Sequence, residues 1–184
     1  MIELYQLEDI ASKCTCCDLH TGRDQPVFSR GNPRSEILVC GMCPGPDENK
    51  AGAPFVGTAG RILDQILIDA YGTTGNVYIT NLVKCFVKPG TKLLESWMDN
   101  CLQYFIVQIK KVEPKVIVAL GQDVCGFFLS SPLSIGKLRT QNYEYLNIPL
   151  ICTYHPSYLA RGGGKKHTDY SKVVEDFRKA LKYL

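Results

Sequence analysis

A small set of side chains in this sequence could together hold a flat heterocycle. The stretch from Val39 to Asp64 contains five glycines, three prolines and one aromatic residue, Phe55, which we expect to be exposed and free to stack on a ring. The Asn81 amide carries a donor and an acceptor side by side, so it can read the carbonyl and N–H edge of a pyrimidine. His155 could donate to a ring oxygen that gains negative charge. These residue types indicate a base-binding site.

Two basic loops could hold phosphate groups near such a site. One spans residues 88–92 and begins with Lys88, and the other spans residues 161–166 and begins with Arg161. Backbone N–H groups near Ser157 could add to them. For either loop taken alone, ordinary solvated surface is the simpler interpretation. A base would have to leave the duplex to reach a pocket at this place.

The cysteines point to a metal site. Nine cysteines are an odd number, and a disulfide framework is not expected in a reducing compartment. Cys14 and Cys17 form a C-x2-C pair, which lets two thiolates reach one metal from a tight turn. One such pair is a weak signal, and it gains weight only if further cysteines join it. Cys101 lies on an apolar helical stripe, where a small core side chain is the alternative.

The elements that position these residues alternate along the chain. Four short apolar runs predict buried strands, and apolar residues at helical spacing predict helices between them. One helix is expected from Thr58 to a stop at Gly72, and weak periodicity marks the first dozen residues. The strands are expected at residues 37–40, 77–81, 116–120 and 150–154, and the other helices at 93–112, around 125–128 and at 173–181.

This alternation predicts a single α/β domain over residues 1–184, a three-layer α/β/α sandwich around a central four-stranded, mainly parallel sheet. The carboxyl ends of parallel strands meet at one edge. Gly41, Asn81, Gly121 and His155 should therefore converge there, and their convergence is what favours a site at that edge.

Composition sets the broad class. Hydrophobic residues make up 45% and charged residues 21% of 184 residues, as in ordinary globular domains. The net charge of +3 permits a nucleic-acid partner without requiring one. No signal pattern and no membrane-length apolar run is visible, so we expect a cytoplasmic, monomeric protein without a membrane partner.

Three separated motifs resemble one family. They are GMCPGPDENKAGAPFVGTAGRILD, VYITNLVKC and YHPSYLAR, and they occur in the family's order. The chain strongly resembles the uracil-DNA glycosylase superfamily, and most closely its family 4, the iron–sulfur-containing enzymes. The resemblance extends over nearly the whole chain, from Cys14 to the final helix. It implies DNA with uracil or another modified base as the substrate.

The resemblance also assigns roles to residues. Phe55 matches the aromatic that stacks on the flipped uracil, Asn81 the amide that reads its edge, and His155 the histidine that stabilises the departing anion. Ser157, Tyr158 and Leu159 match residues that press on the DNA backbone and wedge the opened stack. The cysteines that match the family's ligands to a [4Fe–4S] cluster are Cys14, Cys17, Cys85 and Cys101. By spacing alone, a four-thiolate zinc site is equally possible.

The first motif departs from the family's pattern. The family usually reads Gly-Glu-Gly/Ala-Pro-Gly, where the glutamate is implicated in placing the attacking water, but here Gly41 is followed by Met42 and Cys43. We expect all three residues to touch the base, and Cys43 to add bulk there. Losing an acidic group could slow the reaction by ~10²–10⁴-fold. Asp47 and Glu48 are candidate substitutes, although solvated loop acids are the alternative.

These observations lead to one main hypothesis and two rivals. The main one is a monofunctional DNA glycosylase that flips a uracil or related base and hydrolyses its N-glycosidic bond. A rival is a non-hydrolytic binder of modified DNA in which Met42 has removed catalysis. The other is a metal-containing nucleotide-binding module without a role on DNA.

Overall fold

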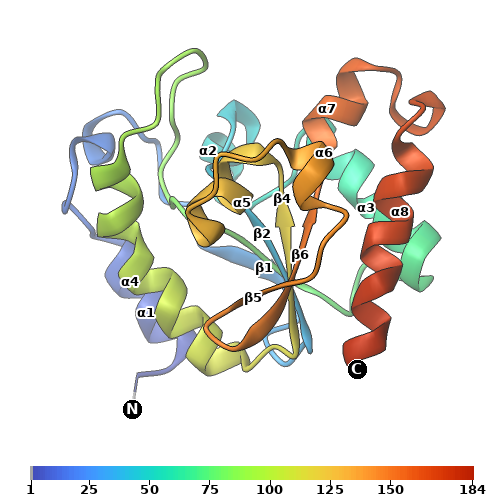
Figure 1. The fold of residues 1–184 in the computed structure, drawn as a ribbon. Coiled ribbons are helices and arrows are strands. Elements are labelled where there is room, and N and C mark those ends of the chain that lie inside the picture. The colour runs from blue at the N-terminus through green and yellow to red at the C-terminus, as the bar shows by residue number, and fades with distance from the viewer. Residues whose placement is uncertain (1) are drawn as a thin grey trace.

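A computed structural model describes residues 2–184. It has three layers, with a twisted sheet between two groups of helices (Figure 1). Helices α1 and α4 lie on one side of the sheet in this view, and α3, α7 and α8 lie on the other. The predicted three-layer α/β/α class is confirmed.

The sheet contains the predicted strands and two more. Within residues 2–184 it has six strands in the order β1-β3-β2-β4-β6-β5, and the four central ones are parallel. The prediction of four strands is too low, because β1 and β5 add short antiparallel edges with no apolar run to reveal them. The strands are β1 Ser29–Gly31, β2 Ile37–Gly41, β3 Tyr78–Asn81, β4 Val116–Leu120, β5 Tyr143–Tyr145 and β6 Ile148–Thr153.

The apolar periodicity of the sequence predicts the long helices but not the short ones. Helices α2, α6 and α7 have six residues or fewer, which is too short for a recurring apolar face. No helix in residues 2–184 is both long and apolar enough to span a membrane. The helices are α1 Leu4–Ser12, α2 Pro46–Ala51, α3 Thr58–Tyr71, α4 Glu95–Val112, α5 Gln122–Leu129, α6 Ile135–Leu138, α7 Pro156–Arg161 and α8 Tyr170–Lys179, with 3₁₀ turns at Asp18–Thr21, Gly164–Lys166 and Ala180–Tyr183.

Side chains along β2 alternate between two hydrophobic clusters. Ile37 and Val39 belong to the cluster under α3 and α8, whereas Leu38 and Cys40 belong to the cluster under α4 and α5. Successive strand residues point to opposite faces of a sheet, so this alternation is expected. It decides where the side chains that follow β2 can point.

A buried polar network joins β3 to α4. The Lys84 ammonium, 2% exposed, donates to Thr80 Oγ1 at 2.8 Å, to Gln108 Oε1 at 2.6 Å and to the backbone carbonyl of Asn81. Gln108 in turn donates to the Tyr78 hydroxyl at 2.9 Å. A buried charge is tolerated only when such acceptors surround it. The network therefore fixes the end of β3 against α4.

We predict that Gln108→Leu lowers the free energy of unfolding by about 2–4 kcal/mol, because it leaves a buried ammonium with one acceptor fewer. Chemical denaturation measures this. The matched control is Gln103→Leu on the exposed face of the same helix, which should change stability by less than about 0.5 kcal/mol. Equal effects of the two substitutions would contradict the network's role.

Candidate active site

A pocket of about 340 Å³ opens at the carboxyl edge of the parallel strands. Phe55, Asn81 and His155 line it, together with Cys43 and Asp47. These residues come from the connection between β2 and α3, from the end of β3 and from the residue before α7. The structure thus brings together the three side chains that the sequence selected for holding a heterocycle.

Asn81 carries an unpaired buried atom. Its residue is 1% exposed, and among residues 2–184 its Oδ1 is the one buried side-chain oxygen or nitrogen without a hydrogen-bond partner. Leaving such a group unpaired typically costs about 1–3 kcal/mol. Because Asn81 lines an open pocket, a ligand with an N–H group could satisfy this oxygen.

Gly41 makes room for the Asn81 amide. The two residues are paired in register between β2 and β3. A Cβ on Gly41 would lie 2.4 Å from Asn81 Oδ1 and 2.7 Å from Cζ of Phe55. Any larger residue would therefore displace both side chains, so Gly41 shapes the floor of the pocket.

Phe55 is buried, not exposed as we expected. It is 6% exposed and belongs to the cluster under α3 and α8, with a positive φ of 56°. Its ring centroid lies 5.7 Å from that of His155, at an interplanar angle of 33°. Arg30 holds the backbone here, since its Nε donates to the Pro54 carbonyl at 2.8 Å. The ring is thus a fixed wall of the pocket.

Glu48 closes the loop that carries Phe55. It is 9% exposed, and Oε1 accepts from the backbone N–H of Val56 at 2.9 Å and of Gly57 at 3.0 Å. Its Oε2 accepts from the N–H of Gly45 at 3.1 Å. Glu48 also lines the pocket, so its suggested role in holding water stays a prediction, but its carboxylate already holds the loop through three backbone hydrogen bonds.

His155 is held as a neutral donor. Its Nδ1 accepts from the backbone N–H of Ser157 at 3.1 Å and lies 2.8 Å from the Ser157 hydroxyl. Burial, with a smaller effect of Arg161, lowers the pKa of His155 to about 4. The accepting Nδ1 leaves the proton on Nε2 in the neutral ring. In the folded protein His155 therefore stays uncharged as the pH falls from 6.5 toward 4. The unfolded chain takes up a proton on this histidine in the same range, so the folded state loses stability as the pH falls below about 6.5.

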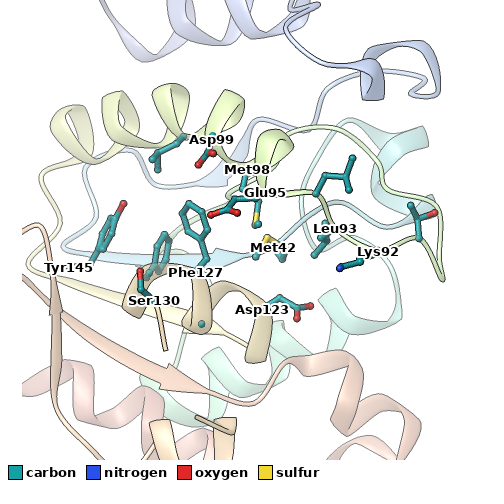
Figure 2. A pocket seen from close by; sticks show the side chains of 15 residues that line it. Met42, Lys92, Leu93, Glu95, Met98, Asp99, Asp123, Phe127, Ser130 and Tyr145 are labelled. Atoms are coloured by element: carbon teal, nitrogen blue, oxygen red, sulfur yellow. The ribbon is translucent and has the colours of Figure 1, made fainter. Parts of the chain in front are cut away.

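Met42 does not line this pocket. It is 7% exposed, belongs to the cluster under α4 and α5, and borders a separate groove (Figure 2). The prediction that the Met42 side chain touches the base is therefore wrong for this structure. The reason is the alternation along β2, which turns residue 42 to the face opposite Gly41. Cys43 does line the pocket, as expected.

Asp47 is the pocket's available carboxylate. It is exposed, lines the pocket and makes no hydrogen bond or ion pair within residues 2–184. A Cβ on Gly57 would lie 2.5 Å from Asp47 Oδ2, so the glycine gives this carboxylate its place over the start of α3. Asp47 can therefore interact with water in the pocket.

The residues expected on DNA divide into two groups. Lys88 and Arg161 are exposed, and Tyr158 is 37% exposed with its hydroxyl donating to Asp169 at 2.9 Å. Ser157 lines the pocket. Leu159, in contrast, is 0% exposed and packs in the cluster under α3 and α8. The prediction that Leu159 wedges DNA is wrong for this conformation, because the short helix α7 turns it inward.

The four cysteines expected to hold a cluster surround one cavity. Cys14, Cys17, Cys85 and Cys101 all line it, and so does Cys16. All nine cysteines are free. Within residues 2–184, however, no three metal-binding side chains lie close enough together to form a ready-made metal site.

Positively charged side chains surround this cavity, and they would favour deprotonated cysteines. Arg23 donates to Cys85 Sγ at 3.1 Å and to the Cys14 carbonyl at 2.9 Å, and Lys84 also lines the cavity. Burial raises the pKa of the Cys101 thiol to about 11, with Lys84 opposing it. A metal would have to displace that proton. The positive charges of Arg23 and Lys84 would therefore favour thiolates at these cysteines, but the four side chains are not drawn together as metal ligands in this conformation.

Four supporting residues were not among the predicted site residues: Arg30, Glu48 in its structural role, Lys84 and Gln108. A signal existed for Glu48, because Pro46 at the start of α2 and a glutamate two residues later match the pattern of a helix N-terminus. Lys84 and Gln108 carry no such signal, since polar residues in apolar segments are usually read as surface.

Comparison with known proteins agrees with this geometry. The model of the uracil DNA glycosylase superfamily matches residues 28–182. The chain therefore belongs to this superfamily.

The chain is similar over nearly its whole length to proteins named type-4 uracil-DNA glycosylase. That of Thermotoga maritima is 35% identical, over 94% of this chain and 90% of the relative. That of Saccharolobus solfataricus is 32% identical over 100% and 88%, and that of Archaeoglobus fulgidus 30% identical over 92% of each. The resemblance to family 4 is thus confirmed.

We predict that Glu48→Ala lowers the free energy of unfolding by about 2–4 kcal/mol and accelerates hydrogen exchange at Val56 and Gly57, because their N–H groups lose a buried acceptor. Glu48→Gln keeps one carbonyl oxygen and should lose less. The neighbouring Asp47→Ala is the control and should have little effect on either measurement. Unchanged exchange in Glu48→Ala would contradict the clamp.

Proposed function

We propose that this protein removes uracil from DNA by hydrolysing the N-glycosidic bond, as a monofunctional uracil-DNA glycosylase in base excision repair. The observation that carries the proposal is the unpaired Asn81 Oδ1 in a pocket between Phe55 and His155. Uracil presents an N–H beside a carbonyl, and the Asn81 amide, oriented as it is here, complements both. Cytosine presents a ring acceptor at the same place and would face Oδ1 with a lone pair.

The mechanism follows from the positions of four residues. Phe55 stacks on the flipped base, and Asn81 fixes its edge. His155 donates from Nε2 to the uracil oxygen that gains charge as the bond to the sugar breaks, and a neutral donor does this without needing a low pH. Asp47 orients the water that then attacks the sugar. The chain's own residues thus bind the base, stabilise its anion and place the water.

Met42 does not count against catalysis. Its side chain faces away from the pocket, so the missing glutamate leaves no gap at the base. The rival hypothesis of a non-hydrolytic binder finds no support in the relatives, which are named as glycosylases. A nucleotide-binding module without a role on DNA is equally unsupported.

DNA is the proposed partner, held along a surface beside the pocket. Lys88 and Arg161 would contact phosphates, together with Ser157 and Tyr158. Uracil as the preferred base, a monomeric state and a cytoplasmic location belong to the same proposal. The nine free cysteines suit a reducing compartment.

The proposal includes a [4Fe–4S] cluster on Cys14, Cys17, Cys85 and Cys101, with zinc as the less favoured metal. The cluster would serve as a structural cross-link between the segment before β1 and α4. Lys84 and Arg23 would neutralise part of its negative charge. In this way it would shape the loop between Cys85 and Cys101 that carries Lys88.

We predict that the protein releases uracil from a uracil-containing oligonucleotide and that Asn81→Ala lowers the single-turnover rate at least about 100-fold. The assay measures abasic sites on single- and double-stranded substrate, alongside hypoxanthine, xanthine and thymine. Asn76→Ala, an exposed position before the same strand, should keep the wild-type rate. Absence of abasic product at high enzyme concentration would refute the proposed reaction.

We predict that Cys17→Ser loses the brown visible absorption of a thiolate-bound iron–sulfur cluster, whereas Cys16→Ser, one residue away, keeps it. Visible absorption and iron content of freshly purified protein measure this. A colourless wild-type protein that contains zinc would show that the four cysteines hold zinc and not an iron–sulfur cluster. Equal loss in both variants would contradict the proposed choice of ligands.

A further inference from the structure

A large groove lies beside the base pocket, between α4, α5 and the segment before α4 (Figure 2). Its volume is about 1110 Å³. Its apolar lining includes two methionines and three aromatic residues, and Leu94 on its edge is 44% exposed. The methionines and aromatics are Met42, Met98, Phe127, Phe128 and Tyr145. We call it the α4–α5 groove.

Three acidic residues border the apolar lining. Glu95 and Asp99 come from α4, and Asp123 comes from α5, so the two walls both carry negative charge (Figure 2). Lys92, in the segment before α4, is the basic residue of the lining, so acidic side chains outnumber basic ones in the groove. All three are exposed, and none forms an ion pair or hydrogen bond within residues 2–184. Glu95 and Asp123 lie in first helical turns, where a negative charge is favourable, but Asp99 lies a turn further on.

This charge excludes some occupants and favours one. With three carboxylates against one lysine, the lining has a net negative charge, which disfavours the phosphates of DNA. They are not gathered as a metal site either, since no group of three metal-binding side chains forms within residues 2–184. An apolar floor with acidic walls complements bulky apolar side chains that have lysine or arginine next to them. Methionines adapt their shape to such side chains.

We propose that the α4–α5 groove binds a basic, apolar segment of a partner protein. The groove and the base pocket occupy opposite faces of the same strand end, because Met42 lines the groove and the next residue, Cys43, lines the pocket. A partner can thus dock without entering the base pocket. The groove gives the protein a recognition site for protein that is separate from its site for the base.

Selection of displayed 12-residue peptides on the intact protein tests this. We expect enriched peptides to combine lysine or arginine with leucine, phenylalanine or tryptophan. Labelled with ¹³C at the methionine methyls, the protein should show saturable shifts of the Met42 and Met98 signals, assigned with Met42→Leu and Met98→Leu. Enriched peptides without basic residues, or with no effect on these two signals, would overturn the proposal.

Paired variants separate the groove's charge from net charge. Glu95→Lys with Asp123→Lys should weaken the selected peptides at least about tenfold. Glu8→Lys with Glu175→Lys makes the same change in net charge at exposed sites outside the groove, and should leave affinity unchanged. Both double variants should keep uracil excision, which shows that they fold. Equal affinity of the selected peptides for both double variants would overturn the proposal. So would a concentration-dependent dimer that the Glu95→Lys, Asp123→Lys variant no longer forms, because a second copy of the protein would then fill the groove.

Discussion

The pocket depends on one buried amide oxygen that the protein leaves without a partner. Asn81 Oδ1 is enclosed by the floor at Gly41 and the ring of Phe55, and neither can donate a hydrogen bond to it. A buried polar atom without a protein partner is unfavourable for folding unless the pocket supplies one. Lys84 fixes the main chain at this point by donating to the backbone carbonyl of Asn81. A base that supplies an N–H gains the hydrogen bond that the folded protein lacks, which turns a folding cost into selectivity.

Two buried charged side chains support that arrangement from different directions. The Glu48 carboxylate gathers three backbone N–H groups and fixes the loop that presents Phe55. The Lys84 ammonium connects the end of β3 to Gln108 on α4, and it also lines the cavity of the cysteines. The cysteine-rich region and the base pocket are therefore in contact through one side chain.

The sequence predicts the position of the site better than its details. The predicted parallel direction of the strands is enough to bring Asn81 and His155 to one edge, because parallel strands end at the same side of the sheet. The orientation of Met42 also follows from the alternation along β2, but only once Gly41 is known to face the pocket. Leu159 was misplaced because α7 is too short to show which of its faces is buried. The sequence around Glu48 carries the pattern of a helix N-terminus, which accounts for its bond to Gly45, but only the folded loop reveals the two donors at Val56 and Gly57.

The most direct test of this account is a crystal structure of the protein with duplex DNA that carries a non-hydrolysable 2′-fluoro-deoxyuridine. The account predicts the uracil flipped into the pocket, with its N3 about 3 Å from Asn81 Oδ1 and a ring oxygen within hydrogen-bond distance of His155 Nε2. Phe55 should lie against the face of the base. A uracil bound elsewhere, or one in the pocket that leaves Asn81 Oδ1 unpaired, would contradict it.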